Sequence, residues 1–409
     1  MSACDPSPAG FGKVTIHELI AAFAAFWWAG SVAALTLSSL VAAVRPRPLS
    51  HFPLGLEKPP VTAIVPIKNL ESDFQAALSS LFAQTYPRLE ISIAAAERES
   101  EVIEMAHRIQ SDHPVIVSRF FHSETKIAAS PKLNTVWSAI SNAPTDLVLT
   151  ADSNIRLESD AVEDFVRHLD PDVGLVSAIT IVENPKGLAA WTEASIVNGY
   201  HGRILMLARS LGLGFGCGKI MLFRRSDLER AGGLHSLSWA LGEDAALTAA
   251  MHALGLRTVF ANRVSRQFLG YKRWREVWQR HLRWMLIWRV QVPAAFVAEL
   301  FGAAIPTALA GALAAHLVGW SGALVAALTL GAWCLAEMLV CLAAGWPLSF
   351  WSPVAFLARE IMILALWLRA LTTNEVFWGE VSCKAGRAPR RERFSMTAGP
   401  ASYPGDCDR

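Results

Sequence analysis

The sequence carries no excess of charge of either sign. Its 409 residues include 37 lysines and arginines against 35 aspartates and glutamates, which gives a formal net charge of +2. Proteins that bind nucleic acids usually concentrate positive charge. The composition therefore gives no support to a nucleic-acid partner, and we expect none.

Cysteines are few and widely spaced. The chain has six of them and no C-x-x-C pair: Cys4, Cys217, Cys334, Cys341, Cys383 and Cys407. Such spacing does not form a dense disulfide framework. We expect reduced thiols, some of them inside a membrane.

Two common nucleotide-binding motifs are also missing. There is no Walker loop, and no G-x-G-x-x-G opens a helix after a first strand. These absences argue against a P-loop ATPase and a classical dehydrogenase. The stretch "LGLGFGCGK" (211–219) is rich in glycine but lies late in the chain. It predicts a loop that approaches a ligand or a helix closely, because glycine carries no side chain.

Apolar residues are abundant and unevenly distributed. The chain is 53% hydrophobic, and its mean hydropathy is +0.32. These values are too high for an ordinary soluble protein and indicate membrane segments. The apolar residues gather at 14–44 and from about 292 to 371. The stretch between them has the size of a soluble domain.

The first apolar segment predicts a transmembrane helix at 14–44. It contains no charged residue from Ile20 to Val44, which exceeds the roughly 20 residues that a membrane-spanning helix needs. This length is too great for the apolar region of a signal peptide. Arg45 and Arg47 follow, and positive charge favours the cytoplasmic side. We therefore expect the N-terminus outside and the central domain in the cytoplasm.

The second apolar region, 292–372, predicts two spans, at about 292–317 and 323–344. A further apolar segment, 350–373, has Arg359 and Glu360 at its centre. Charges there are costly in lipid, so they indicate a paired, functional or interfacial position. Because the basic tail, 373–409, favours the cytoplasm, we expect this segment to be re-entrant or interfacial and to form part of a lipid entrance. The alternative is one more span with an external tail.

The central region, 58–270, alternates between short apolar runs and helical periods. Strands are predicted at 61–67 and 89–95, and further strands at "VIVSRFF" and "DLVLTA", with helices between them. Repeated strand–helix units predict an α/β domain with a parallel sheet and right-handed crossovers. Ligands of such domains bind at the carboxyl ends of the strands.

Acidic residues occur where predicted strands end or helices begin. Asp152 and Asn154 follow "LVLTA", a pattern that suits Mg²⁺ or Mn²⁺ holding a diphosphate. The alternative for Asp152 is a helix cap or an Asx turn. Glu97 follows "ISIAAA", and a solvated loop carboxylate is its alternative. Asp244 lies in "LGEDAAL", where it can also serve as a partner of the helix dipole.

The segment 271–290 interleaves arginine and tryptophan in "WREVWQRHLRWMLIWRV". This pattern, directly before an apolar region, predicts an amphipathic helix at the membrane interface. Arginines at the mouth of a site would also suit a diphosphate leaving group.

Taken together, these pieces resemble the membrane-bound ceramide glucosyltransferases, which are inverting enzymes with the GT-A (Rossmann-like) fold. The resemblance covers most of the chain. It rests on "VTAIVPIKNLE", "LSSLFAQTYPRLEI", "SPKLN", "TADSNIRL", "CGKIMLFRRSDLERAGGL", "LGEDAAL" and "RHLRW". The last piece matches the family's R/Q-x-x-R-W motif at Arg280, Arg283 and Trp284.

The resemblance implies a role for each matching residue. Asp152 would anchor the divalent metal of a UDP-sugar, with Asn154 nearby, and Asp244 would be the general base. Three cations would neutralise the diphosphate: Lys132, Arg280 and Arg283. Glu97 stands where the family usually has an aspartate that contacts the nucleotide, so the sequence departs from the family there.

The expected function is transfer of a hexose, with glucose expected, from a UDP-sugar to the hydroxyl of a ceramide-type lipid. The enzyme would be an integral membrane protein, in the inner membrane if bacterial, with its catalytic domain on the cytoplasmic face. A transferase for another lipid, such as a hopanoid or polyprenyl lipid, is one alternative. A catalytically decayed membrane scaffold is another. A processive polysaccharide synthase would need more spans to form a channel.

Overall fold

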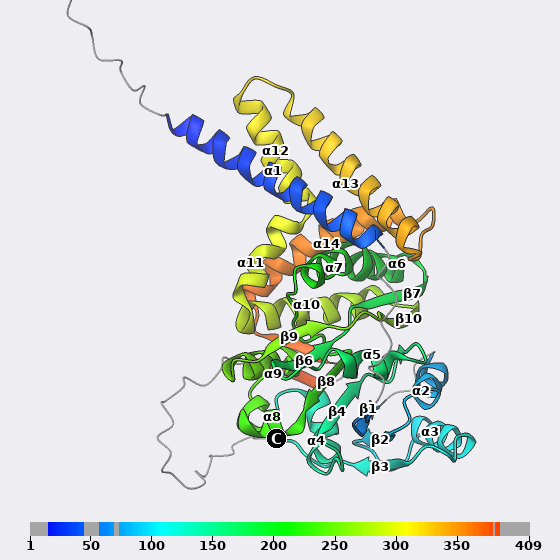
Figure 1. Ribbon diagram of the computed structural model, residues 1–409. Helices are drawn as coiled ribbons and strands as arrows, with labels where there is room; N and C mark the ends of the chain where they lie inside the picture. Colours follow the sequence, from blue (N-terminus) through cyan, green and yellow to red (C-terminus); the bar gives the residue numbers. More distant parts are fainter. Residues whose placement is uncertain (1–14, 45–56, 69–72, 379–380, 385–409) are drawn as a thin grey trace, which may run out of the picture.

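The computed structural model describes residues 15–44, 57–68, 73–378 and 381–384 (Figure 1). Figure 1 shows an α/β body, from which helices α1, α12 and α13 project together on one side. Residues 45–56, which include Arg45 and Arg47, and residues 385–409 of the predicted basic tail lie outside the described part. Cys4 and Cys407 also lie outside it, and of the described cysteines Cys217, Cys334 and Cys341 are free thiols.

The body is built on a seven-stranded sheet with the order β3-β2-β1-β4-β8-β6-β9. Strands β1 (Val61–Ile67) and β2 (Leu89–Ala95) have the predicted bounds. The others are β3 (Ser118–His122), β4 (Leu147–Ala151), β6 (Val173–Ser177), β8 (Ile220–Arg224) and β9 (Arg257–Phe260). Strand β8 runs antiparallel to both β4 and β6. The predicted parallel pairing is present among β3, β2, β1 and β4 and between β6 and β9, and β8 is the antiparallel strand of an otherwise parallel sheet.

Helices cover both faces of the main sheet. Successive side chains of a strand point to opposite faces, so a strand can contribute to two apolar clusters, one on each face. Val61, Ala63 and Val65 of β1 pack in one cluster, while Ile64 packs in another. The first cluster includes residues of α2 (Phe74–Phe82), α3 (Glu101–Asp112) and α5 (Ala161–Arg167). The second includes residues of α4 (Pro131–Ser141), α8 (Arg225–Arg230) and α9 (Glu243–Ala253).

A smaller sheet links the body to the helical layer. It has the order β5-β10-β7, with β5 (Ile155–Arg156), β7 (Thr180–Lys186) and β10 (Ser265–Tyr271). Strand β7 leads into α6 (Leu188–Ala194), a π-helical segment (Ser195–Gly202) and α7 (Arg203–Ser210). Helix α10 (Trp274–Gln291) follows β10, and the hairpin of β11 (Glu375–Trp378) and β12 (Val381–Lys384) packs against it. This hairpin begins the region predicted as a tail.

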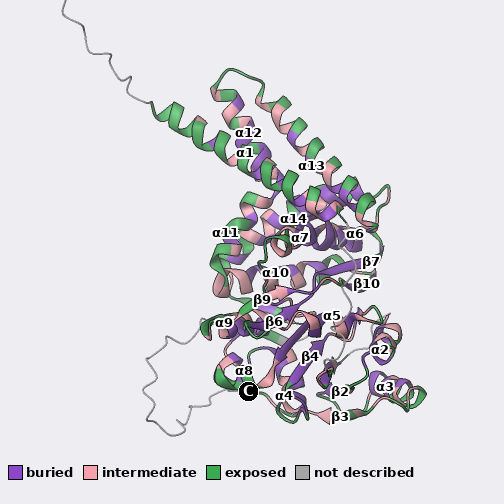
Figure 2. Cartoon of the chain, in the orientation of Figure 1, coloured by how far each residue is buried: buried purple, intermediate pink, exposed green. Residues whose placement is uncertain are grey.

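Two described helices are long and apolar enough to cross a membrane: α1 (Ile16–Ala43) and α13 (Gly322–Ala344). Figure 2 shows exposed residues along the outer faces of the projecting helices, and Phe26, Leu40 and Leu328 are among them. The predicted span at 292–317 is not one straight helix. It consists of α11 (Pro293–Gly302) and α12 (Ala304–Leu317), which are bent by 60° relative to each other. If this bent pair is one span, the described part has up to three.

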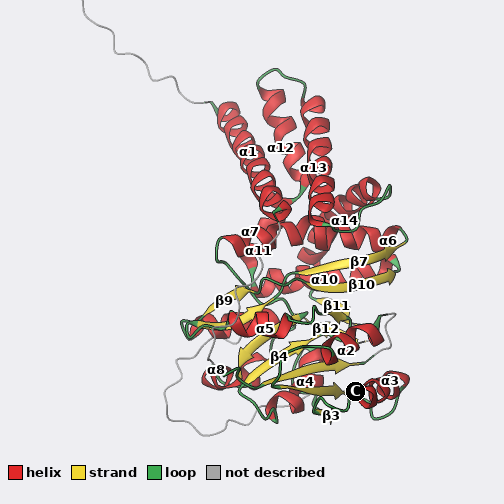
Figure 3. Ribbon diagram, turned by 45° about the vertical axis from the view of Figure 1, so that its right-hand side comes forward, coloured by secondary structure: helices red, strands yellow, loops and turns green. Residues whose placement is uncertain are grey.

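Helix α14 (Ser352–Thr372) lies between the projecting helices and the α/β body (Figure 3). Its central charges are fully buried and paired. Arg359 lies 2.6 Å from both Glu337 and Glu360. Glu360 Oε2 also accepts hydrogen bonds from the Ala304 and Ile305 N–H groups, at the N-terminus of α12. The paired interpretation of these charges is confirmed. Both side chains are 0% exposed, so neither is presented at the surface of this segment. A lipid entrance formed by the segment stays a prediction.

Candidate functional site

The candidate site lies at the edge of the main sheet where β1, β2 and β4 end. The antiparallel direction of β8 places its first residues at this same edge, since Ile220 pairs with Ala151. The Asp152 N–H donates to the Lys219 carbonyl at 2.9 Å. Lys219 Nζ lies 3.2 Å from Asp152 Oδ2. A residue just before β8 thus meets the carboxylate just after β4.

A second lysine, Lys132, reaches Asp152 from helix α4. Ser130 caps α4, and Lys132 is the second residue of that helix. Lys132 Nζ lies 2.7 Å from Asp152 Oδ1 and 3.3 Å from Glu243 Oε1. The Ser130 hydroxyl donates to Glu243 Oε2 at 3.0 Å. Lys132 therefore joins the end of β4 to the start of α9.

The charges in this group stabilise one another. Burial alone would lower the pKa of Lys132, but Asp152 and Glu243 hold it above its usual value. Burial would likewise raise the pKa of Asp152, yet Lys132 and Lys219 hold it below its usual value. Asp152 is consequently ionised at neutral pH, and both lysines are presented to the site as cations.

The glycine-rich loop wraps the N-terminus of α9, where Asp244 is the second residue. Asp244 Oδ2 accepts from the Gly218 N–H at 2.9 Å. A side chain added at Gly216 would come within 2.7 Å of the Asp244 carbonyl oxygen. Only a residue without a Cβ fits there. The prediction that this loop approaches a helix closely is confirmed.

Asp244 has the electrostatic environment of a weak base. Burial, together with the neighbouring Glu243, raises the pKa of Asp244 to about 6. The Ala245 and Gly218 N–H groups and Lys132 act in the opposite direction. The two adjacent carboxylates differ in their partners, because Glu243 contacts Lys132 and Ser130. Asp244 instead accepts from backbone N–H groups.

Helix α10 brings two arginines to this group. Burial and the neighbouring Arg280 lower the pKa of Arg283 to about 10, while Glu243 and Asp152 act to raise it. Arg283 therefore lies within electrostatic range of both carboxylates. Arg280 Nη1 donates a hydrogen bond to Glu193 of α6. Of the two predicted arginines, Arg280 is thus held by a buried carboxylate.

Trp284 packs inside the protein, beside the apolar cluster that includes Ala190 and Leu269. Trp278 and Trp288 also pack against buried residues, whereas Trp274 is 46% exposed. Three of these tryptophans therefore pack in part against buried side chains, and the placement of α10 at a membrane interface stays a prediction.

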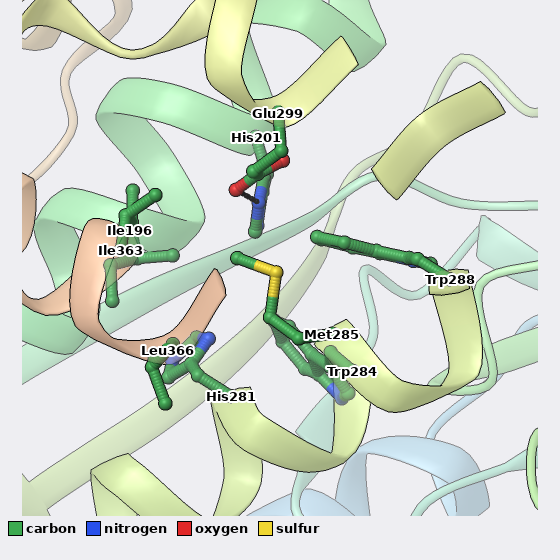
Figure 4. A pocket seen from close by; sticks show the side chains of 9 residues that line it. All are labelled: Ile196, His201, His281, Trp284, Met285, Trp288, Glu299, Ile363 and Leu366. Atoms are coloured by element: carbon green, nitrogen blue, oxygen red, sulfur yellow. Dashed lines mark ion pairs between the residues drawn. The ribbon is translucent and has the colours of Figure 1, made fainter. Parts of the chain in front are cut away.

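A small cavity lies beside Trp284 (Figure 4). It has a volume of about 10 Å³, which is room for about one water molecule. His201, His281 and Glu299 line it together with apolar side chains. His201 Nε2 lies 3.5 Å from Glu299 Oε1. Burial holds the pKa of His281 well below its usual value, so this histidine is neutral. Helix α10 thus lines a small cavity with residues His281, Trp284, Met285 and Trp288.

The two remaining predicted residues lie in different surroundings. Asn154 is buried, 6% exposed, in the turn between β4 and β5. Glu97 is exposed in the loop that follows β2. Because β2 and β4 both run parallel to β1, Glu97 and Asp152 follow strands that end at the same edge.

A divalent cation at this edge would need ligands beyond the protein. Within the described ranges, no three His, Cys, Asp or Glu side chains lie close enough to hold one. The ionised Asp152 offers a hard oxygen ligand of the kind that Mg²⁺ and Mn²⁺ prefer. Mg²⁺ is often held by one or two carboxylates together with substrate phosphates. The residues therefore fit a cation shared between Asp152 and a diphosphate.

Sequence reasoning missed three residues of the site: Lys219, Glu243 as a partner of Lys132, and Glu193. The adjacent acids in "LGEDAAL" were visible, but their separate partners were not. Lys219 is the last residue of the glycine-rich stretch 211–219, so that stretch was a usable signal. Glu193 lies 87 residues before Arg280 in the chain, and no pattern in the sequence connects them.

Comparison with known proteins gives consistent matches. A family model described as glycosyl transferase family 21 matches residues 20–387. Ceramide glucosyltransferase 1 of Caenorhabditis elegans is 23% identical over 243 residues, which cover 59% of this chain and 52% of that protein. Ceramide glucosyltransferase 3 of the same organism is 22% identical over 264 residues, which cover 64% and 58%. The matches thus span about half the length of these curated relatives.

One solved structure shares the fold across nearly its whole length. It is a mannosyltransferase from Pyrobaculum calidifontis in complex with GDP-Man and Mn²⁺. The TM-score is 0.50 at 18% identity, with 86% of this chain and 99% of that chain covered. This likeness supports the predicted GT-A fold of the α/β body.

Proposed function

The chain belongs to glycosyl transferase family 21, and from this premise we propose that it transfers a hexose, with glucose expected, from a UDP-sugar to the headgroup hydroxyl of a ceramide-type lipid. The transfer inverts the anomeric carbon and forms a glycosphingolipid. One observation carries the proposal: Asp152, Lys132 and Asp244 lie together at one edge of the main sheet. Helix α10 lies beside them and is followed in the chain by the bent pair α11–α12.

In the proposed reaction, Asp244 accepts the proton of the lipid hydroxyl. The hydroxyl oxygen attacks the anomeric carbon from the side opposite the diphosphate, and a new glycosidic bond forms as the bond to UDP breaks. The electron pair of the broken bond leaves with UDP. A general base of this kind contributes roughly 10²–10⁴-fold to the rate. A carboxylate with a pKa of about 6 suits this role, because it is ionised at neutral pH and still basic.

Lys132, Lys219 and Arg283 supply positive charge where the diphosphate leaves. They are held before the reaction begins, Lys132 and Lys219 by Asp152. Cations fixed in this way stabilise developing charge without reorganisation. Asp152, with Asn154 nearby, would hold the divalent metal, which when bound neutralises charge on the diphosphate. Glu97, at the end of β2, would contact the nucleotide.

The proposed substrates place the site at a membrane surface. Helices α1 and α13 and the bent pair α11–α12 would anchor the chain, with the domain of residues 58–270 on the cytoplasmic face, in the inner membrane if bacterial. Residues 271–290 and α14 would lie at the interface between that domain and the lipid. The acceptor hydroxyl would then reach Asp244 from the lipid side.

A UDP-release assay on the purified full chain in lipid vesicles tests this function. We expect release from UDP-glucose when ceramide is present and none without a lipid acceptor. If UDP is released with a hopanoid or polyprenyl acceptor but not with ceramide, the acceptor belongs to that other lipid class. No release with any of these lipids, while UDP-glucose binds, would favour the scaffold.

A further inference from the structure

Glu193 is a buried carboxylate that contacts the predicted diphosphate site through one neighbour. It lies on α6, its side chain is 1% exposed, and it accepts a hydrogen bond from Arg280 Nη1. A buried carboxylate is stable only when it is paired, and a charge-assisted bond to a guanidinium provides the pairing. The contact therefore fixes both side chains.

The position of Arg280 matters because of the residue one turn further along α10. Arg280 and Arg283 are three residues apart, so they are neighbours on the helix surface. Their charges repel, and Arg280 contributes to the lowered pKa of Arg283. A carboxylate beside Arg280 offsets this repulsion. It lets two guanidinium groups stay close together in a partly buried place.

A guanidinium has several N–H donors in a rigid, planar fork. It can therefore bind a carboxylate and a phosphate at the same time, whereas a lysine ammonium lacks this geometry. The side chain of Arg280 is 21% exposed, so part of it faces solvent while Glu193 is buried beneath it. This arrangement suits a cation that is oriented from behind toward an anion in front.

We propose that Glu193 is a positioning residue for the donor diphosphate. It acts through Arg280, by holding that guanidinium beside Arg283 before the nucleotide binds. This inference rests on the proposed function, because it concerns the binding of the same nucleotide-sugar. Glu193 itself does not touch the donor.

The test compares UDP binding by calorimetry in the full chain and its variants. Glu193→Gln should weaken UDP binding about tenfold, in line with the loss of one charge-assisted hydrogen bond. Arg280→Lys should weaken it similarly. The double variant should bind UDP within about twofold of Arg280→Lys alone, because residues that act through one contact are not additive. In transfer assays, Glu193→Gln should raise the KM for the donor more than that for the lipid.

Glu183→Gln is the matched control, since Glu183 pairs with Arg266 on β7 and β10. It should leave UDP binding unchanged. If Glu193→Gln fails to fold, Glu193→Asp keeps the charge with a shorter reach, and it should fold and still bind UDP more weakly than the original chain. Unchanged UDP affinity in the Glu193 variant, or additive losses in the double variant, would overturn the inference. If the original chain binds UDP but transfers no sugar to lipid, that result would instead count against the proposed function.

Discussion

Lys132 Nζ lies 2.7 Å from Asp152 Oδ1. This contact pairs the first turn of α4 with the end of β4. Lys219 approaches the other oxygen of the same carboxylate. Asp152 therefore has two duties in the proposed reaction. It orients two cations toward the diphosphate, and it offers an oxygen ligand to a metal.

Asp152→Ala should abolish transfer and weaken UDP-sugar binding, because the metal loses its carboxylate and two lysines lose their common partner. Asn154→Ala should cost less, since an amide is the poorer ligand for a hard cation. Calorimetry with UDP-glucose, with and without Mn²⁺, measures both effects. Asp146→Ala is the control, because Asp146 is exposed just before β4, at the opposite end of that strand. Near-normal activity of Asp152→Ala in the presence of a chelator would contradict the metal site.

The pH dependence follows from the raised pKa of Asp244. A general base must be ionised to act, so turnover should fall as the pH drops through about 6. Glu243 is the second cause of the raised value, after burial. Glu243→Gln removes a neighbouring negative charge and should therefore move the midpoint to lower pH. A pH–rate profile at saturating donor would show this shift. A midpoint that stays in place or rises would mean that another group controls the profile.

Glu97→Gln should raise the KM for the UDP-sugar more than it lowers turnover, which is the signature of lost ground-state binding. The side chain is exposed beyond β2, on the edge where the site lies. Glu99→Gln, two residues further along the same exposed loop, is the matched control. Equal KM values for the UDP-sugar in the two variants would mean that Glu97 is a solvated loop carboxylate that does not contact the nucleotide.

Arg359→Ala should destabilise the fold strongly, because it leaves Glu337 and Glu360 buried without their shared cation. Breaking a buried ion pair by removing one partner typically costs about 3–5 kcal/mol. Thermal unfolding in detergent measures this loss. Arg369→Ala, which changes an exposed arginine of the same helix, should unfold close to the original temperature. If both variants melt alike, the buried network does not support the fold.

The strands were predicted well where local pattern controls them. The run 61–67 is buried on both faces of the sheet, so it appears as a continuous apolar stretch. The direction of β8 depends on long-range pairing with β4, which no local pattern encodes. Lys219 was missed for that reason, although the glycine loop before it was interpreted correctly.

Long-range packing also explains the other differences. The bend between Gly302 and Ala304 follows Glu299 within the predicted span, and Glu360 accepts hydrogen bonds from the backbone N–H groups of Ala304 and Ile305 there. The hairpin of β11 and β12 buries Val376 and Cys383 beside α10. Its short strands lie at the start of the segment 373–409, which is predicted from the sequence as a basic tail on the cytoplasmic side. In each case the deciding contacts join residues far apart in the chain.

The central claim is that Asp244 removes a proton from a lipid hydroxyl while a UDP-sugar is held beside it. The most direct measurement is hexosylceramide formation from UDP-glucose and ceramide, followed by mass spectrometry, with UDP-glucose binding measured on the same samples. The full chain should form the product. Asp244→Asn should lower turnover by on the order of a hundredfold or more while binding stays nearly unchanged. Product formation at the original rate by Asp244→Asn, with loss in Glu243→Gln, would contradict the claim.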